Sequence, residues 1–445
     1  MHTLPEHSSL EIEFPEAKES IDSIVFRKRR TDGLCAAFTK TGENLTISST
    51  YYVGADWIPG SDSKHPFFVE PKLNPKFDYV SGEPKGLTTE EAAKLKRIDV
   101  SKMLFEALSH PGIYEHTQEL FEIKFDSPHI PLPKQDDLLS PLLIIRFLTV
   151  VKEIVRKGLK KSYYQVDRNL YGKVKGKVLV GQTVKQNLVK NKDLHTYCRF
   201  EEFGDNGIEN RLIKKTLLFV QRYLYTFKGL MGQKFFQQTL DYIQPAFGNV
   251  SAEVELYQIK QVKFNAFYKD YNEAVRLAQT ILKRFGYNIQ AIQNLPTIDT
   301  PPYWIDMSKL FELYVLGKLK DRFKSTARLE YQFGDRANHL DFLLDSGSHK
   351  MVIDAKYKTR YIDHFKTEDI RQVSGYARLK KVHKFFDLDH GTLIDCVIVY
   401  PDIENGEEDI PEKLDKNPIN DYFGMYKLGL KIPLIVSTRA TTCQV

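Results

Sequence analysis

The chain has 445 residues, of which 42% are hydrophobic and 27% charged, a composition typical of a globular protein with roughly two or three domains. Its formal net charge of +6 permits binding to nucleic acid without requiring it. The four cysteines have no CxxC spacing, which argues against a zinc ribbon or a disulfide framework and is consistent with a reducing cytoplasm.

The first region, residues 1 to about 130, is predicted to be rich in β-strands. Its N-terminal residues carry neither the basic nor the apolar segment of a secretory signal peptide. Short runs such as SIVFRK and PFFVEPKL are rich in β-branched and aromatic residues and are bounded by turn residues, as strands are. One helix is expected after Thr88, where Glu91 follows at capping-box spacing. The region contains no cluster of acids, lysines or metal ligands that indicates chemistry.

The middle region, residues 131–295, is predicted to be mainly helical because three segments repeat apolar residues at helical spacing. The most apolar of them, residues 140–155, is too short to span a bilayer and carries Arg146 in its middle. We therefore interpret it as a buried helix of a soluble protein.

A basic, glycine-spaced segment, residues 171–192, interrupts these helices. Its lysines are Lys173, Lys175, Lys177, Lys185, Lys190 and Lys192. They could contact phosphates or a partner, or they could be the solvated lysines of a β-hairpin that protect an edge strand. We favour contact with nucleic acid or a partner protein, through Lys173, Lys175 and Lys177.

The third region, residues 296–445, begins at consecutive prolines and has a different pattern. We expect a helix over 304–324, three short strands over 327–356, a helix over 366–381 and a strand over 393–400. This order predicts an α/β domain, and the chain as a whole is expected to be a multidomain α+β protein. We expect this region to fold alone.

Two acids and a lysine lie in a predicted hairpin of this region. In HLDFLLD, alternation places Asp341 on the face opposite to Leu340 and Phe342. The returning strand, MVIDAKYK, places Asp354 and Lys356 on one face, so that Asp341 and Asp354 can meet. Two carboxylates that close resist ionising unless a cation lies between them, and Mg²⁺ takes oxygen ligands. Lys356 can then orient or help to deprotonate a metal-polarised water, as phosphodiester hydrolysis requires.

The alternative is that the Asp-x-Lys pattern marks a solvated strand edge or a surface salt bridge. Three features favour a site: the apolar strand before Asp354, the second acid, and Glu312 among the apolar residues of MSKLFELYVLGKL. A buried glutamate needs a partner, and a metal-bound water would be one. His339 and His349 flank the hairpin but lack ligand spacing, so we expect surface or supporting roles for them.

These motifs resemble the PD-(D/E)xK nuclease core. More narrowly, residues 304–400 resemble the McrC family, the nuclease subunit of McrBC-type and related LlaJI-type restriction systems. The matching pieces are MSKLFELYVLGKL, LDFLLD, MVIDAKYK, DIRQVSGYARL and VIVYP. Upstream, FFVEPKL, GKVKGKVL and FEEFGDNGIENRLIKKTL look like more degenerate family motifs. One departure is Leu340, which stands where many relatives have proline.

The resemblance implies a role for each matching residue. Asp341 and Asp354 become metal ligands, with the Ala355 carbonyl as a further ligand, and Lys356 becomes the catalytic lysine. Glu312 becomes an outer or metal-site carboxylate. Gln372 and Tyr376, four apart on a helix, are placed toward the lysine or DNA.

The resemblance also implies a function, namely a cytoplasmic, Mg²⁺-dependent endonuclease that cuts double-stranded DNA in defence against foreign DNA. Such proteins work in a hetero-oligomer with a separate, McrB-like AAA+ GTPase, and this chain has no GxxxxGK[ST] loop of its own. Residues 1–130 are then the expected partner-interaction region. Two alternatives remain, namely a non-catalytic regulatory subunit that activates the GTPase and a nuclease of the same fold that acts on RNA.

Overall fold

The computed structural model forms a mixed α/β protein with several sheets. It describes residues 1–28, 32–60, 65–74, 87–108, 110, 113–117, 119–133, 136–226, 234–254, 268–284, 297–323, 327–334, 339–347, 349–358, 367–389 and 391–435. The mixed composition of helices and strands agrees with the sequence-based expectation.

The chain divides into two compact units. The inserted unit is Ser140–Pro296, close to the helical middle region expected at 131–295. The discontinuous unit joins Met1–Leu139 with Thr297–Val445, so the expected first and third regions lie in one unit. The physical reason is β14 (Tyr303–Asp306), which follows the paired prolines and enters a sheet made of N-terminal strands.

The N-terminal part of the discontinuous unit is rich in strands, as expected. Its strands are β1 (His2–Pro5), β2 (Ser9–Glu13), β3 (Ile24–Phe26), β4 (Gly33–Thr41), β5 (Asn44–Ser49), β6 (Tyr52–Trp57), β7 (Pro66–Glu70), β8 (Phe121–Ile123) and β9 (Ile130–Pro133). Between β7 and β8 lie α1 (Thr89–Lys94), α2 (Val100–Ala107) and the 3₁₀ helix η1 (Ile113–His116). The predicted capping box is present, because the Glu91 amide donates to Thr88 at 3.3 Å and Thr88 donates back to the Glu91 carboxylate at 3.1 Å.

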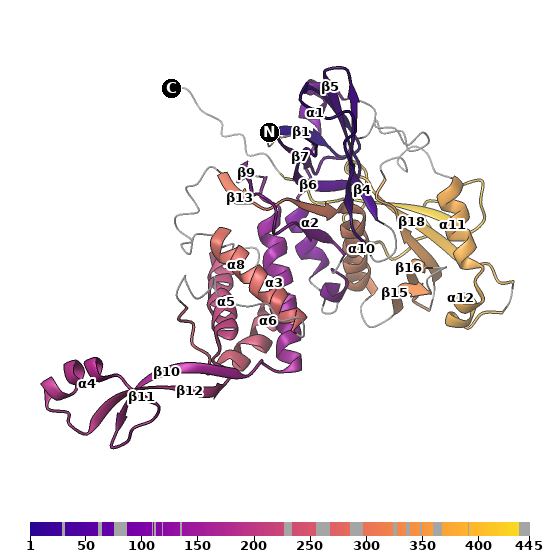
Figure 1. Ribbon diagram of the computed structural model, residues 1–445. Helices are drawn as coiled ribbons and strands as arrows, with labels where there is room; N and C mark the ends of the chain where they lie inside the picture. The colour runs from indigo at the N-terminus through magenta and orange to yellow at the C-terminus, as the bar shows by residue number, and fades with distance from the viewer. Residues whose placement is uncertain are drawn as a thin grey trace, which may run out of the picture. The chain divides into compact units, whose positions relative to one another are not determined.

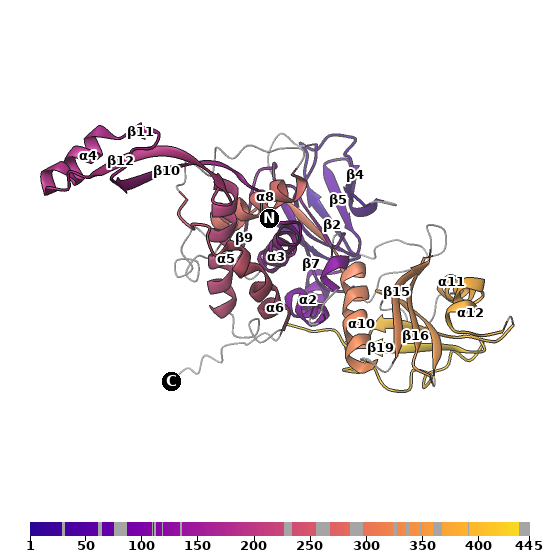
Figure 2. The ribbon, with the colours of Figure 1, turned by 90° about the horizontal axis from the view of Figure 1, so that it is seen from below.

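Strand β14 is an inner strand of the five-stranded sheet β1-β7-β6-β14-β8. It pairs with β6 on one side and β8 on the other. The buried Trp304 indole donates to Asp56 at 2.9 Å. Gly54 faces it so closely that a Cβ there would lie 2.0 Å from the Tyr303 carbonyl oxygen. A further pair, β13 (Thr297–Thr300) with β9, also joins the two segments of this unit. The C-terminal segment is therefore built into the N-terminal sheet (Figure 2).

The C-terminal part of the unit contains a second five-stranded sheet in the order β15-β16-β17-β18-β19. Its elements are α10 (Met307–Phe323), β15 (Arg328–Gly334), β16 (His339–Asp345), β17 (Lys350–Ala355), α11 (Thr367–Ala377), α12 (Lys380–Phe385), β18 (Asp395–Pro401) and β19 (Met425–Leu430). The first three strands are antiparallel, whereas β17, β18 and β19 run parallel.

Helices cover both faces of this sheet. Helices α11 and α12 lie on one face and α10 lies on the other (Figure 1). Ile370 and Val373 of α11 pack against Val352 and Ile398 in a core of fully buried side chains. The three strands and the strand over 393–400 are confirmed. The helix predicted over 304–324 begins only at Met307, because residues 304–306 belong to β14. The helix predicted over 366–381 is divided into α11 and α12, and β19 was not predicted.

The inserted unit consists of helices and one long hairpin. Its elements are α3 (Leu139–Lys157), β10 (Ser162–Tyr171), β11 (Lys177–Val178), α4 (Val180–Gln186), η3 (Leu188–Lys190), β12 (His195–Gly204), α5 (Ile208–Thr226), α6 (Lys234–Ile243), η4 (Gln244–Phe247) and α8 (Lys269–Arg284). Strands β10 and β12 pair over ten residues, from Ser162 with Gly204 to Tyr171 with His195. In Figures 1 and 2 this hairpin extends away from the helices of its own unit, with α4 at its tip.

Helix α3 contains the apolar run that the sequence predicted to be a buried helix. Most of its side chains are buried, and Arg146 pairs with Glu273 of α8 at 2.6 Å. Within the described part of the chain, no helix combines the length and the apolar character that crossing a bilayer requires.

Candidate active site of two aspartates and a lysine

Strands β16 and β17 bring the two predicted acids together. Their ladder ends at the pair Phe342 and Ile353, and Asp341 and Asp354 are the next residues on each strand. Beyond the last pair, Asp341 Oδ2 accepts a hydrogen bond from the Ala355 amide at 2.8 Å. Asp354 is 3% exposed. The hairpin register therefore places both carboxylates at one end of the ladder, as the sequence predicted.

Burial raises the pKa of both carboxyl groups, and neighbouring acids raise it further. For Asp341, burial raises the pKa most, followed by the charges of Asp354 and Glu312. For Asp354, burial again raises the pKa most, although the neighbouring Lys356 lowers it. Both carboxylates resist ionising in the protein alone, which is the electrostatic condition that a bound cation relieves.

Lys356 lies beside Asp354, with its Nζ 2.8 Å from Asp354 Oδ2. Burial lowers the pKa of this lysine, but the charges of Asp354 and Asp341 outweigh burial and raise the pKa above its ordinary value. The amine is therefore held as an ammonium ion. In that state it donates hydrogen bonds and stabilises negative charge, whereas it cannot accept a proton.

Gln372 and Tyr376 of α11 form a short chain of hydrogen bonds to this lysine. Lys356 Nζ donates to Gln372 Oε1 at 3.1 Å, and Gln372 Nε2 donates to the Tyr376 hydroxyl at 2.8 Å. The predicted i, i+4 placement toward the lysine is therefore observed, and it orients the ammonium group.

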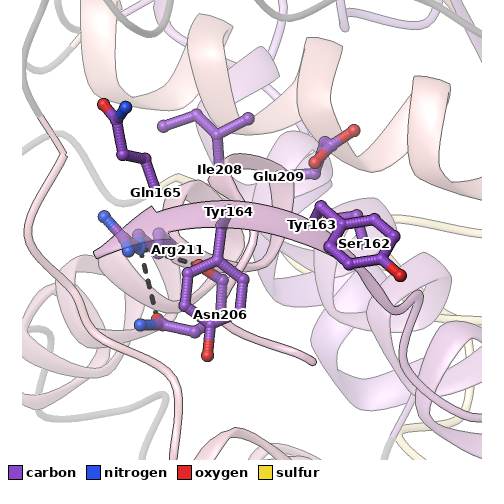
Figure 3. Close-up of a pocket in the computed structure, with 8 residues that line it drawn as sticks. All are labelled: Ser162, Tyr163, Tyr164, Gln165, Asn206, Ile208, Glu209 and Arg211. Atoms are coloured by element: carbon purple, nitrogen blue, oxygen red, sulfur yellow. Dashed lines mark hydrogen bonds between the residues drawn. The ribbon is translucent and has the colours of Figure 1, made fainter. Parts of the chain in front are cut away.

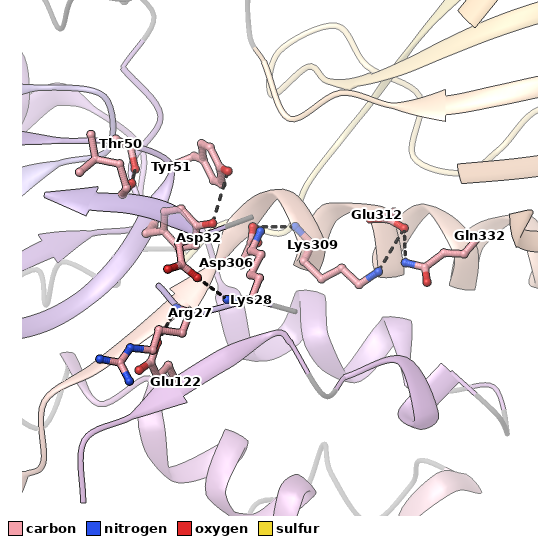
Figure 4. Close-up of polar contacts among 12 residues, drawn as sticks. Arg27, Lys28, Asp32, Thr50, Tyr51, Glu122, Asp306, Lys309, Glu312 and Gln332 are labelled. Atoms are coloured by element: carbon pink, nitrogen blue, oxygen red, sulfur yellow. Dashed lines mark hydrogen bonds and ion pairs between the residues drawn. The ribbon is translucent and has the colours of Figure 1, made fainter. Parts of the chain in front are cut away.

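Glu312 of α10 is the third acid near the pair, since its charge raises the pKa of both aspartates. Its carboxylate lies 3.2 Å from Lys309 Nζ and accepts from Gln332 Nε2 at 3.2 Å (Figure 4). Neither Lys309 nor Gln332 was singled out from the sequence. The i, i+3 spacing of Lys309 and Glu312 could have indicated the contact of Lys309. Gln332 gave no such signal, because it lies on a strand twenty residues away from Glu312.

The donor set suits a hard divalent cation that keeps part of its water shell. Asp354 Oδ2 is buried, and the Lys356 ammonium group lies 2.8 Å from it. No group of three or more His, Cys, Asp and Glu in the described residues is arranged to hold a metal. Two carboxylates and the Ala355 carbonyl, completed by waters, would match the ligand preference of Mg²⁺, which is usually bound through one or two carboxylates.

The predicted basic contacts lie in the tip of the hairpin. Lys173, Lys175 and Lys177 are exposed, and Lys175 Nζ lies 4.3 Å from the centre of the Phe200 ring. Large apolar side chains are exposed beside them, including Val174 at 62% and Val189 at 74%. The tip therefore offers both charge and apolar surface.

Two cavities lie away from the acids. One of about 450 Å³ is at the base of the hairpin and contains Arg211, whose Nε donates to Asn206 at 2.9 Å (Figure 3). The other, of about 640 Å³, lies beside α11 and is lined in part by Ser374, Cys396 and the 93% exposed Phe423. Neither includes a predicted site residue.

Of the two flanking histidines, His349 lies in the β16–β17 turn, where its amide donates to Ser346 at 3.2 Å, and His339 begins β16.

Comparison with known protein families identifies the family of the chain. The model of the McrBC 5-methylcytosine restriction system component family matches residues 84–388. The chain belongs to this family. Comparison with curated proteins gave no match.

Two solved structures are similar to this member of the McrBC component family. One is in a refined half-complex from the tetradecameric assembly of Thermococcus gammatolerans McrB AAA+ hexamers with bound McrC, with 16% identity, 89% of this chain and 80% of that chain covered, and a TM-score of 0.34. The other is in the cryo-EM structure of the Thermococcus gammatolerans McrBC complex, with 14% identity, 72% of this chain and 86% of that chain covered, and a TM-score of 0.27. The assignment to the family rests on the family model.

Proposed function

We propose that this McrBC-family chain is a Mg²⁺-dependent DNA endonuclease with a PD-(D/E)xK site at Asp341, Asp354 and Lys356. The observation that carries the proposal is the buried pair of aspartates beside an ammonium group. Such a cluster is unfavourable in a purely structural role, because each buried charge costs free energy unless it is compensated.

The residues of the chain have distinct parts in the proposed hydrolysis. Asp341, Asp354 and the Ala355 carbonyl would hold Mg²⁺, which when bound polarises a water and the scissile phosphate. Lys356 stabilises the negative charge that develops on the phosphate, because it is fixed as an ammonium ion. Gln372 keeps that ammonium group oriented, and Tyr376 in turn fixes the amide of Gln372.

We further propose that the chain acts in the cytoplasm within a hetero-oligomer that includes an AAA+ GTPase. Membership in the McrBC restriction system component family supports this. The hairpin tip suits a protein partner, because exposed valines accompany its lysines. A surface for phosphates alone does not require apolar side chains.

The test is cleavage of plasmid DNA by the purified chain with Mg²⁺, with and without an McrB-like AAA+ GTPase. Parallel substrates are unmethylated DNA, DNA with 5-methylcytosine, and RNA. We expect cleavage of DNA that needs Mg²⁺, and we expect Asp354→Ala to abolish it while partner binding persists. Cleavage that survives this substitution would show that the active site lies elsewhere.

The second candidate is a non-catalytic subunit that only activates the GTPase. It predicts no cleavage under any condition and full GTPase stimulation by Asp354→Ala. Its difficulty is the cost of keeping two repelling acids buried without a chemical use. Cleavage of RNA in preference to DNA would instead support a nuclease of the same fold that acts on RNA.

A further inference from the structure

A chain of polar contacts joins the four-stranded sheet β2-β5-β4-β3 to the start of α10. Lys28, which follows β3, forms an ion pair with the carboxylate of Asp306, whose side chain is 1% exposed (Figure 4). The other oxygen of Asp306 accepts from the Lys309 amide at 2.9 Å and thereby caps the helix. Asp306 therefore fixes the start of α10 and is itself held by Lys28, next to the four-stranded sheet.

Lys309, one turn into the helix, connects this cap to the acids. Its Nζ lies 3.2 Å from Glu312 and 2.5 Å from the hydroxyl of Tyr331 on β15. Its side chain is 14% exposed, so the contact is shielded from solvent. Tyr331 stacks on Phe342, the residue after Asp341, with ring centres 5.6 Å apart. Lys309 thus contacts Glu312 on its own helix and Tyr331 on β15, the strand that pairs with β16.

Gln332 completes the cluster from a strained backbone position. Its φ of 51° is in the left-handed region, where a residue with a side chain pays a conformational cost. The register of β15 with β16 continues on both sides of Gln332 but omits its pairing with Asp341. Its amide instead donates to Glu312 and to the Tyr331 hydroxyl, both at 3.2 Å. The strand is distorted opposite the acid, and the distortion aims Gln332 at Glu312.

We propose that Lys309 is a positioning residue that fixes Glu312 on the side of the Asp341–Asp354 pair, and that Lys28 links this arrangement to the four-stranded sheet that contains β3. The proposal rests on the proposed nuclease site and deepens it. The charge of Glu312 acts on both aspartates, and Gln332, which stands opposite Asp341 in the strand register, donates to it. A cation beside Glu312 offsets the repulsion among the three acids. Lys309 supplies that cation from the side of α10, whereas Lys356 supplies the charge on the side of β17.

The test compares Lys309→Met with Lys318→Met in the full chain. Lys318 is on the same helix, its side chain is 17% exposed, and it pairs with Glu106 at 3.3 Å and Asp409 at 2.7 Å, away from the site. We expect Lys309→Met to raise the Mg²⁺ concentration for half-maximal cleavage by about tenfold or more, as loss of an outer contact to a metal site does. Lys318→Met should leave it unchanged, and Lys309→Arg should restore most of the loss.

Two further measurements separate positioning from general damage. Mn²⁺ binding by calorimetry without DNA should weaken in Lys309→Met, and Lys28→Met should weaken it in the same direction by a smaller factor. Equal effects of Lys309→Met and Lys318→Met on Mn²⁺ affinity would overturn the proposal, as would an unchanged Mg²⁺ requirement. If the wild-type chain binds Mn²⁺ through Asp354 but cuts no nucleic acid, the nuclease proposal fails while positioning is still decided by the calorimetry.

Discussion

Asp341 has a pKa well above its usual 3.8, raised by burial and then by Asp354. A folded state that holds the proton more tightly than the unfolded chain is stabilised at low pH. That stability is fully present below the unfolded pKa and is lost as pH rises through the folded pKa. Near neutral pH without a metal, the carboxyl group of Asp341 therefore works against folding, because it ionises more readily in the unfolded chain.

The first prediction follows from the raised pKa of Asp341. Asp341→Asn should raise the melting temperature of the metal-free chain near neutral pH by a few degrees, with the difference shrinking as pH falls toward about 4. In Mg²⁺ the order should reverse, because only the wild type binds the ion through this carboxylate. Thermal unfolding in EDTA and in Mg²⁺ across pH tests both statements. A variant that is less stable than wild type in EDTA at neutral pH would contradict the electrostatic argument.

The second prediction concerns the ammonium group of Lys356. Lys356→Ala should lower the cleavage rate by about 100-fold or more, which is the usual effect of removing one donor that stabilises a developing negative charge. Mn²⁺ binding should persist, since both carboxylates remain. Loss of Mn²⁺ binding would assign the lysine a structural role. Lys358→Ala is a suitable control, because this neighbouring lysine pairs instead with Asp369 at 2.9 Å.

At the scale of single elements, the sequence predicted the features that follow from the local periodicity of strands and helices. The strands that carry Asp341 and Asp354 follow from alternation, and the i, i+4 spacing of Gln372 and Tyr376 follows from the helix. Gln332 was not predicted, because nothing in RLEYQFG marks the left-handed residue that turns its side chain to Glu312. Strand β19 was also missed, because its segment MYKLGL contains a lysine and a glycine and belongs to the sheet only through pairing with β18.

The third prediction concerns the hairpin formed by β10 and β12. Its last pair is Tyr171 with His195, and the segment between them, residues 172–194, carries the lysines and the exposed valines. Replacing 172–194 with Asn-Gly should close the two strands with a tight turn and preserve the fold. We expect Mn²⁺ binding to be unchanged and stimulation of the partner GTPase to fall at least about tenfold, since the proposed contact surface is gone.

The control for the shortened hairpin is a full-length chain in which Lys173, Lys175 and Lys177 are replaced by Gln. If charge alone made the contact, this variant would behave like the deletion. We expect it to retain part of the stimulation, because the apolar side chains remain. Undiminished stimulation by the shortened hairpin would remove the tip from the partner interface.

At the scale of the whole molecule, the boundary near residue 296 has a different meaning from the one expected. The sequence change at the paired prolines is real, but the next strand, β14, pairs with β6 and β8 of the N-terminal segment. A fragment that begins at residue 296 would leave both edges of β14 unpaired and expose the buried Trp304. Long-range pairing of this kind is not recorded in local sequence patterns, which is why we expected the third region to fold alone.

The last prediction uses the position at which the inserted unit leaves the discontinuous one. Strands β9 and β13 flank the insertion, and they pair antiparallel, with Thr297 opposite Pro133. The two ends of the insertion are therefore already close within the discontinuous unit, so a short linker can replace residues 140–296 without moving either strand. We expect the shortened chain to fold and to bind Mn²⁺ like wild type, because the acids, Lys309 and Lys28 all belong to the retained unit. It should not stimulate the GTPase, since the hairpin is absent.

A fragment from residue 296 should bind Mn²⁺ poorly in the same calorimetric assay. The opposite pattern, with tight binding by the fragment and none by the shortened chain, would show that the metal site depends on the insertion and not on the N-terminal sheet.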